Sequence, residues 1–309
     1  MAFASGAGTR LAYVPETVFG VVPSDPAFQE MRVTGSGLKS AKVTGVSKEL
    51  SVLRDVKDIT LLGIDASGDI PFEFSYGSMD DILAAALFGK WEGDILKNGS
   101  ERQYFTIEET LDLGNGAKSY HRFPGSMISK LAMNIAAREV VSGTLSVKAS
   151  REEVADAALT GSTYVPANTE PVSTASANVA ELSFTGFDPP LVKSFTLEID
   201  NSLRDRTAVG SLYSEEFGFG ALEVKGTMEA YFQDNKLYKE MLAHGTGSFS
   251  FDIGNASGKK YKFTIPRFRF ADGSKNLNGS DSDVMLSLPW QGILSPDDGC
   301  TLIIERGIA

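Results

Sequence analysis

A seven-residue stretch occurs twice in this sequence, in two related forms. It reads Gly68-Asp69-Ile70-Pro71-Phe72-Glu73-Phe74 in the first half and Gly226-Thr227-Met228-Glu229-Ala230-Tyr231-Phe232 in the second. In both forms apolar or small side chains alternate with more polar ones, which predicts a β-strand with one buried face. A duplicated strand of this kind indicates two similar units in tandem, which is typical of a building block for a symmetric assembly.

A short amphipathic helix is expected after each form of the stretch. Apolar residues at helical spacing predict one helix over residues 79–88, which ends at Gly89, and another over residues 235–244, which ends at Gly245. Further alternating segments predict several more strands after each helix. The sequence therefore predicts a mainly β fold with two repeated β-sandwich or barrel domains in tandem, each with a flanking short α-helix.

Composition divides the chain into four segments. Residues 1–30 contain several Pro, Gly and Ala residues, which predicts an irregular N-terminal arm that stays flexible or docks on a neighbouring subunit. Residues 31–150 and 188–309 form the two repeated domains, and residues 151–187, rich in Ala, Ser, Thr and Asn, read as a linker or long surface loop. Residues 55–65 read as a loop with an apolar centre. Other strands are expected over residues 43–52, 103–108, 119–123, 129–136, 140–149, 192–200, 248–253, 260–270, 283–290 and 301–305.

Overall composition excludes several classes of protein. The chain has 309 residues, of which 42% are hydrophobic and 22% charged, which is typical of a folded globular protein. Its formal net charge of -11 argues against tight binding to nucleic acid, which requires clustered Lys and Arg. We expect no membrane segment and no secretory signal, because no apolar run is long enough. The single cysteine, Cys300, excludes an internal disulfide.

Signatures of catalysis and of metal binding are scarce in the sequence. The two histidines, His121 and His244, stand at unrelated positions of the two units, and no nucleophile elbow, zinc-binding helix or phosphate loop occurs. Residues 276–283 resemble part of a calcium loop but lack its leading Asp and its closing Glu, so an Asx-rich hairpin loop is expected there. We therefore predict no enzyme activity, no cofactor and no metal site.

A charged tripeptide precedes the duplicated strand in each unit. It is Leu53-Arg54-Asp55 in the first and Leu203-Arg204-Asp205 in the second. A ring would make the same contact repeatedly, so ion pairs between neighbouring units are one interpretation, and ordinary solvated loop charges are the other. The candidate inter-subunit contacts are thus Arg54, Asp55, Arg204 and Asp205.

Taken in order, several stretches resemble the tail tube (major tail) proteins of long-tailed bacteriophages, the two-repeat family of about this length. The stretches are residues 10–20, 31–35, 68–77, 80–87, 201–204 and 283–291. The resemblance covers nearly the whole chain, and residues 151–187 contribute least to it. It rests on the ordered set, because no single stretch is chemically diagnostic.

The resemblance implies a structural virion protein that self-assembles into stacked rings. In that family each repeat is a β-sandwich with a flanking helix, and sheets of neighbouring units join around a channel through which genomic DNA reaches the host. N-terminal arms, long loops and C-terminal segments reach the next ring. The implied partners are further copies of the chain and the tape measure, tail terminator and tail tip proteins, with assembly in the host cytoplasm and DNA passing without specific binding.

The duplication also favours a particular ring. Three chains with two units each supply six sheets, which predicts a trimeric ring with pseudo-sixfold symmetry, and a hexamer with one repeat turned outward is the alternative. The net charge of -11 suits a channel that repels DNA phosphates. Removal of residues 1–30 is expected to leave both domains folded and to block ring stacking.

The alternative is a different class of function for a two-domain β-protein. A β-sandwich binding module, such as an adhesin or a carbohydrate-binding protein, needs an exposed aromatic platform. Trp91 and Trp290 are the candidates, and both stand beside strand or helix ends, where burial is expected. A hydrolase would need a paired nucleophile and base, which the sequence does not indicate.

Overall fold

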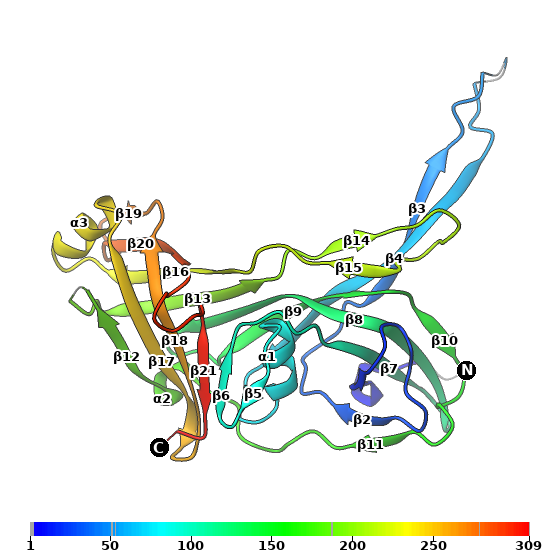
Figure 1. The fold of residues 1–309 in the computed structure, drawn as a ribbon, viewed down its shortest axis with the longest axis horizontal. Helices are drawn as coiled ribbons and strands as arrows, with labels where there is room; N and C mark the ends of the chain where they lie inside the picture. Colours follow the sequence, from blue (N-terminus) through cyan, green and yellow to red (C-terminus); the bar gives the residue numbers. More distant parts are fainter. Residues whose placement is uncertain (1–2, 51, 53, 187, 278, 309) are drawn as a thin grey trace.

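The computed structural model describes residues 3–50, 52, 54–186, 188–277 and 279–308. Figure 1 shows two β-rich units side by side, the first coloured blue to green and the second yellow to red, with a long hairpin projecting from the first. The prediction of a mainly β fold is confirmed. The sheets are large and open, and they do not close into a barrel within the chain.

In both units a short helix follows the strand that carries the duplicated stretch, and further strands follow the helix. The first unit contains β1 (Arg10–Glu16), β2 (Ala27–Glu30), β3 (Lys39–Val46), β4 (Ile59–Glu73), α1 (Asp80–Ala86), β5 (Trp91–Glu92), β6 (Ile95–Lys97), β7 (Tyr104–Gly114), β8 (Ala117–Ala136) and β9 (Ser142–Ala149). The connecting segment contains β10 (Glu153–Ala155), β11 (Thr163–Val165), α2 (Ala175–Asn178) and β12 (Val179–Thr185). The second unit contains β13 (Val192–Asp200), β14 (Arg204–Arg206), β15 (Glu216–Gly218), β16 (Glu223–Tyr231), α3 (Lys236–Leu242), β17 (Thr246–Ala256), β18 (Lys259–Phe270), β19 (Ser274–Asn276), β20 (Met285–Gly292) and β21 (Ile303–Arg306).

One continuous sheet runs through both units. Its strands are hydrogen-bonded in the order β3, β4, β9, β8, β13, β16 and β20. The junction between the units is the antiparallel ladder of β8 and β13, which pairs Lys130 with Asp200 and Ala136 with Ser194. Hydrophobic side chains on one face of this sheet, among them Ile70, Leu197 and Trp290, are buried in a single core shared by both units.

The two duplicated strands occupy equivalent places in this sheet. Gly68 of β4 lies opposite Val147 of β9, and Gly226 of β16 lies opposite Trp290 of β20. A Cβ atom on Gly68 would stand 2.2 Å from the carbonyl oxygen of Gly37, and one on Gly226 would stand 1.9 Å from that of Thr196. In each unit the glycine therefore lets the preceding strand approach closely.

Alanine at Gly226 should destabilise the second unit, because its Cβ atom would force β13 and β16 apart. Overpacking of this kind costs about 1–3 kcal/mol of unfolding free energy. Urea denaturation followed by circular dichroism measures the change. Gly6→Ala is the matched control, since a Cβ atom at Gly6 meets nothing within 4 Å. Equal urea midpoints for Gly226→Ala and Gly6→Ala would show that β13 and β16 do not need a glycine at position 226.

The expectation of an irregular N-terminal arm is wrong for residues 10–16 and 27–30. Strand β1 pairs with β7 along its whole length and also with β2, and Leu11 and Val14 are buried. The Tyr13 hydroxyl donates a 2.8 Å hydrogen bond to Asp81 at the start of α1. The proline and glycine residues of this segment suggested irregular structure, but β1 is stabilised by β7, which lies almost a hundred residues away in the sequence. Removal of residues 1–30 would therefore delete two strands of the first unit, β1 and β2, rather than a flexible arm.

The connecting segment is likewise more ordered than a loop. Strand β10 pairs with β8, β11 runs parallel to β2, and β12 pairs with β17 of the second unit. The Tyr164 hydroxyl donates to Glu108 at 2.6 Å, and burial together with this hydrogen bond raises the pKa of Tyr164 to about 12. Residues 151–187 thus run across the first unit and end as a strand of the second; residue 187 lies outside the described residues.

The loop expected over residues 55–65 is also wrong in part. Strand β4 begins at Ile59, because the apolar and β-branched run that follows pairs with β3 and extends the hairpin beyond the body (Figure 1). At the other end of the chain, β21 pairs with both β18 and β6. Arg306 of β21 forms a 2.7 Å ion pair with Asp80 of α1. The described C-terminal residues are therefore bound within the chain, rather than free to reach the next ring.

Candidate assembly site

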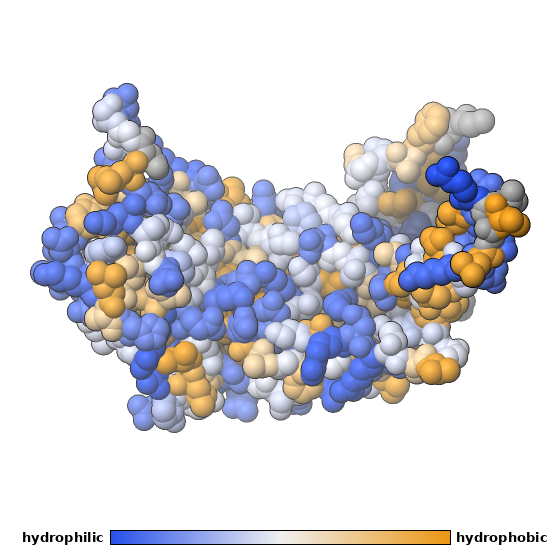
Figure 2. Space-filling view, turned by 90° about the horizontal axis from the view of Figure 1, so that it is seen from above, coloured by the Kyte–Doolittle hydropathy of each residue, from blue (hydrophilic) through white to orange (hydrophobic). Residues whose placement is uncertain are grey.

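The exposed face of the continuous sheet is polar and concave. Figure 2 looks onto the molecule from this side and shows hydrophilic and intermediate residues between two projections. Small hydroxyl side chains are frequent on it, among them Thr144, Ser146, Thr196 and Thr227, in keeping with their alternation with buried neighbours. A shallow hollow of about 590 Å³ lies over the junction of β8 and β13. The two units thus present one joint surface.

Acidic side chains outnumber basic ones on this face. By the alternation of the strands, its acids are Asp65, Asp69, Glu73, Glu198, Asp200, Glu223 and Glu229, and its bases are Lys39, Lys130, Lys148, Lys225 and Arg269. Glu198 lies 2.8 Å from Lys130, and Glu223 lies 2.7 Å from Lys225. Asp69 accepts a 2.6 Å hydrogen bond from Ser146 and has no cationic partner among the described residues. The face therefore carries a net negative charge.

The sheet has an open edge at each end. At one end, the segment before β3 pairs with β4 only through sparse contacts, such as the hydrogen bond from Gly37 N to Asp69 O (2.8 Å). At the other end, β19 pairs with β20, and no described strand covers its opposite side. Open edges leave backbone donors and acceptors unpaired and are templates for pairing with another chain.

The projecting β3–β4 hairpin exposes apolar side chains. Val46 and Ile59 form a cross-strand pair and are 53% and 62% exposed, and Leu61 on the same face is 38% exposed. Orange residues gather on this projection in Figure 2. A row of exposed apolar residues on a lone hairpin marks an interaction site or an aggregation hazard.

The corresponding hairpin of the second unit is packed down instead of projecting. Strands β14 and β15 lie on the first unit, where Phe217, only 1% exposed, contacts Phe88 and Met127 in a small hydrophobic cluster. Backbone contacts extend the packing, because Ile64 N donates to Leu212 O at 2.7 Å. The chain therefore contains one completed hairpin-on-unit contact of its own.

Charged residues flank this packed hairpin. Asp205 forms a 2.7 Å ion pair with Lys148 of β9, and Glu216 forms ion pairs with Arg206 and with Arg102 of the first unit. Most of these groups are partly exposed, so each pair contributes little alone and mainly sets the hairpin's position.

The four predicted contact residues fall in two different environments. Arg204 and Asp205 lie in strand β14 rather than in a loop, and they bind within the chain: Arg204 donates to Phe219 O at 3.2 Å. Arg54 and Asp55 are exposed beyond the end of β3 and have no ion pair among the described residues. Leu53 lies outside the described residues. Whether Arg54 and Asp55 contact another subunit stays a prediction.

Sequence reasoning missed the residues that make the contact between the units. Lys148, Glu216 and Arg102 carry no motif, and their spacing gives no signal, because they meet only when β14 and β15 fold onto β9. The duplicated strand itself contains a signal that identifies equivalent residues of the two hairpins. Counted back from Gly226 and Gly68, Phe217 and Ile59 both lie nine residues upstream, which marks them as equivalents.

One group of residues has the composition of a hydrolytic triad. His121 lies 3.2 Å from Ser119 Oγ through Nε2 and 2.8 Å from Glu152 through Nδ1. Although burial opposes it, hydrogen bonds from His121 and Ser40 hold the pKa of Glu152 below its ordinary value. Ser119 lines neither the hollow over the β8–β13 junction nor the cavity beside α3. The group holds β10 and β3 against β8.

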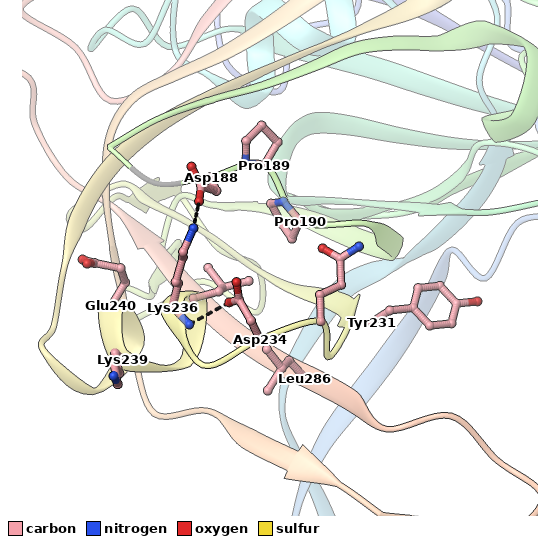
Figure 3. A pocket seen from close by; sticks show the side chains of 11 residues that line it. Asp188, Pro189, Pro190, Tyr231, Asp234, Lys236, Lys239, Glu240 and Leu286 are labelled. Atoms are coloured by element: carbon pink, nitrogen blue, oxygen red, sulfur yellow. Dashed lines mark hydrogen bonds and ion pairs between the residues drawn. The ribbon is translucent and has the colours of Figure 1, made fainter.

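A cavity of about 340 Å³ lies between the end of the connecting segment and α3 (Figure 3). Lys236 spans it, forming a 2.7 Å ion pair with Asp188, while its backbone N–H donates to Asp234. This contact lowers the pKa of Asp188 and raises that of Lys236. Its charged groups are exposed, and its lining holds no nucleophile paired with a base.

The aromatic platform of a binding module is not apparent in the described residues. Trp290 is 2% exposed within the core, and Trp91 is covered by the guanidinium of Arg306, 4.4 Å from its ring centroid. In the described residues, no cluster of three metal-ligating side chains occurs. Asn278 of the Asx-rich loop lies outside the described residues. No described helix is long and apolar enough to cross a membrane.

Comparison with known proteins agrees with these features of the fold. A search of curated proteins found no match. The profile of the family described as phage tail tube protein matches residues 6–292, which span both units and the segment between them. The match therefore extends over the continuous sheet, both hairpins and the shared core. The chain belongs to the phage tail tube protein family.

Proposed function

We propose that three copies of this chain close into a ring, and that rings stack into the tube through which genomic DNA leaves the virion. The observation that carries the proposal is the β8–β13 ladder, because it joins two equivalent units into one sheet while leaving complementary edges at both ends. The family is one of structural tail proteins, which supports the same reading. The proposed partners are further copies, with the tape measure, tail terminator and tail tip proteins, and assembly in the host cytoplasm.

The equivalence of the units identifies which edges would join. In the first unit, Ala132, Met133 and Asn134 of β8 lie opposite Thr144, Gly143 and Ser142 of β9. In the second unit, Ser274, Lys275 and Asn276 of β19 lie opposite Ser287, Leu286 and Met285 of β20. When Gly68 is aligned with Gly226, residues 142–144 of β9 align with residues 285–287 of β20. Strand β19 is therefore the counterpart of the part of β8 that pairs with β13.

The register of the proposed junction follows from the same alignment. Asn134 pairs with Thr196 and Ala132 with Glu198 inside the chain. Glu198 lies opposite Lys225, and Lys39 lies opposite Ser67, so Lys39 is the counterpart of Glu198. We therefore expect residues 274–276 of one chain to pair antiparallel with residues 37–39 of the next. Three such junctions and three internal ones would close six units into a barrel and remove every open edge.

The polar face would then line the channel. Its acids exceed its lysines, and an acidic wall repels phosphate groups, so a duplex would slide without binding. Its small hydroxyl side chains provide no stacking platform for bases. The acidic excess on this face agrees in sign with the net charge of -11 of the whole chain.

Charge reversal on this face should make the tube retain DNA. In Asp69→Lys/Glu229→Lys, two acids of the proposed wall become cations, so assembled tubes should bind double-stranded DNA with a salt slope steeper by about 0.9 for each phosphate contacted. Filter binding of DNA to tubes across a salt series measures the effect. Asp188→Lys/Asp234→Lys at the cavity beside α3 is the matched control. Equal DNA retention by both variants would show that the polar face does not line the channel.

Self-assembly itself is tested by negative-stain electron microscopy of the purified protein after concentration and incubation. Rings or hollow tubes are expected, because each free edge has its complement on another copy. Particles that stay single 33.1 kDa chains at every concentration would contradict the proposal. A glycan screen of such a monomer would then test the binding-module alternative.

A further inference from the structure

We propose that the β3–β4 hairpin of one chain packs on the second unit of the next chain in the same ring, as the β14–β15 hairpin packs on the first unit within the chain. This inference rests on the proposed ring and names a contact that holds it together. It differs from a hairpin that reaches the following ring, which is the arrangement that the family resemblance implies for long loops.

The two hairpins are equivalent residue by residue. Ile59 and Phe217 lie nine residues before the aligned glycines, and Leu61 and Phe219 lie seven before them. Ile59 is paired with Val46, and Phe217 is paired with Asp205. Val46 is thus the counterpart of Asp205. The strand ladders agree at the other end, where Val33 pairs with Phe72 and Val192 with Ala230.

One face of the hairpin is covered in the second unit and uncovered in the first. Phe217 is 1% exposed against the first unit, whereas its counterpart Ile59 is 62% exposed. Phe219 is likewise packed against that cluster, whereas Leu61 remains partly open. A second copy of the chain would cover this face of the β3–β4 hairpin. The geometry would be the one that the chain already uses where β14–β15 packs on the first unit.

The receiving surface follows from the ladders of the second unit. Lys148, which binds Asp205, lies opposite Ser67 and Met127, and Gln291 lies opposite Lys225 and Arg269. Gln291 and Arg269 are therefore the counterparts of Lys148 and Met127.

Two further features mark this surface. His244 takes the place of Phe88, because each follows its helix with a positive φ, of 53° and 46°, and precedes a glycine. Leu242, two residues before His244, is 67% exposed and adds apolar area. The surface thus offers apolar area to the hairpin.

Thiol crosslinking tests the contact directly. In a Cys300→Ala background, Val46→Cys/Gln291→Cys is treated with a short bis-maleimide after assembly and separated on a denaturing gel. The control pair Lys148→Cys/Asp205→Cys places thiols at the equivalent internal contact, where Lys148 and Asp205 are 2.7 Å apart. The control should crosslink within one chain. The test pair should give species of two and three chains, ending at three.

The outcomes separate this contact from the proposed function. If rings form and the test pair stays single-chain, the hairpin docks elsewhere and the ring proposal stands. Products longer than three chains would indicate that the hairpin joins successive rings, which also contradicts the lateral contact. If neither rings nor crosslinked chains form, the proposed function and the contact fall together.

Discussion

Replacing Ile59 and Leu61 together with aspartate will abolish ring formation while leaving the single chain folded. Both side chains are exposed in the chain by itself, so the variant loses no core contact. In the proposed ring both are covered by the next copy. Ile59 is 62% and Leu61 38% exposed, so covering both buries about as much area as one whole side chain, which contributes about 1.5–3 kcal/mol. Their loss should raise the concentration needed for assembly by at least about 10-fold. The two new charges, which are neighbours on one face of β4, weaken association further.

Sedimentation velocity across a concentration series measures this change, and circular dichroism melting checks the fold. Val209→Asp is the matched control, because Val209 is fully exposed at the tip of the packed hairpin and outside the proposed contact. The control should assemble as the natural sequence does. Rings formed by I59D/L61D at the concentration of the natural chain would overturn the proposed role of the hairpin.

Arg122→Met will destabilise the first unit by up to about 3–5 kcal/mol, because it removes the nearer cation of a buried carboxylate. Arg122 Nε lies 2.7 Å from Glu108 Oε2, and Glu108 is entirely buried between β7 and β8. Arg122 also donates to Ala157 O at 2.8 Å and so ties the connecting segment to β8. In the variant, Tyr164 keeps its hydrogen bond to Glu108, and the remaining cation is Arg10, whose guanidinium lies 3.9 Å from the carboxylate.

Urea denaturation at neutral pH measures the loss. Lys236→Ala, which breaks the exposed ion pair with Asp188, should leave the midpoint unchanged because solvent screens that pair. Arg122→Met/Glu108→Met removes both charges and should recover most of the stability. A midpoint for Arg122→Met equal to that of the natural chain would show that the pair does not hold the first unit together.

The sequence was sufficient for the strands and helices whose pattern is local. Strand β13 has the bounds that alternation predicted, and α1 and α3 lie within their predicted ranges. In each, the spacing of apolar residues reflects one buried face, which neighbouring residues reveal. The duplicated strands also occupy the equivalent places that their likeness indicated, and both carry a glycine where another strand approaches.

The elements that the sequence did not predict are those that depend on pairing between distant segments. Strand β1 looks irregular in sequence because its stability comes from β7, which lies far away along the chain. The shared tripeptide suggested that Asp55 matches Asp205, whereas the ladder makes Val46 the counterpart of Asp205. A short charged motif recurs easily by chance, but a register fixed by a glycine and its strand partners does not.

A cryo-electron microscopy reconstruction of the assembled tube tests the central claim most directly. We predict three chains in each ring, six similar units around the channel, a ladder between residues 274–276 and residues 37–39 of the next chain, and Asp69 and Glu229 facing the channel. Six chains in each ring with one repeat turned outward, or a channel wall formed by another face of the sheet, would contradict the account.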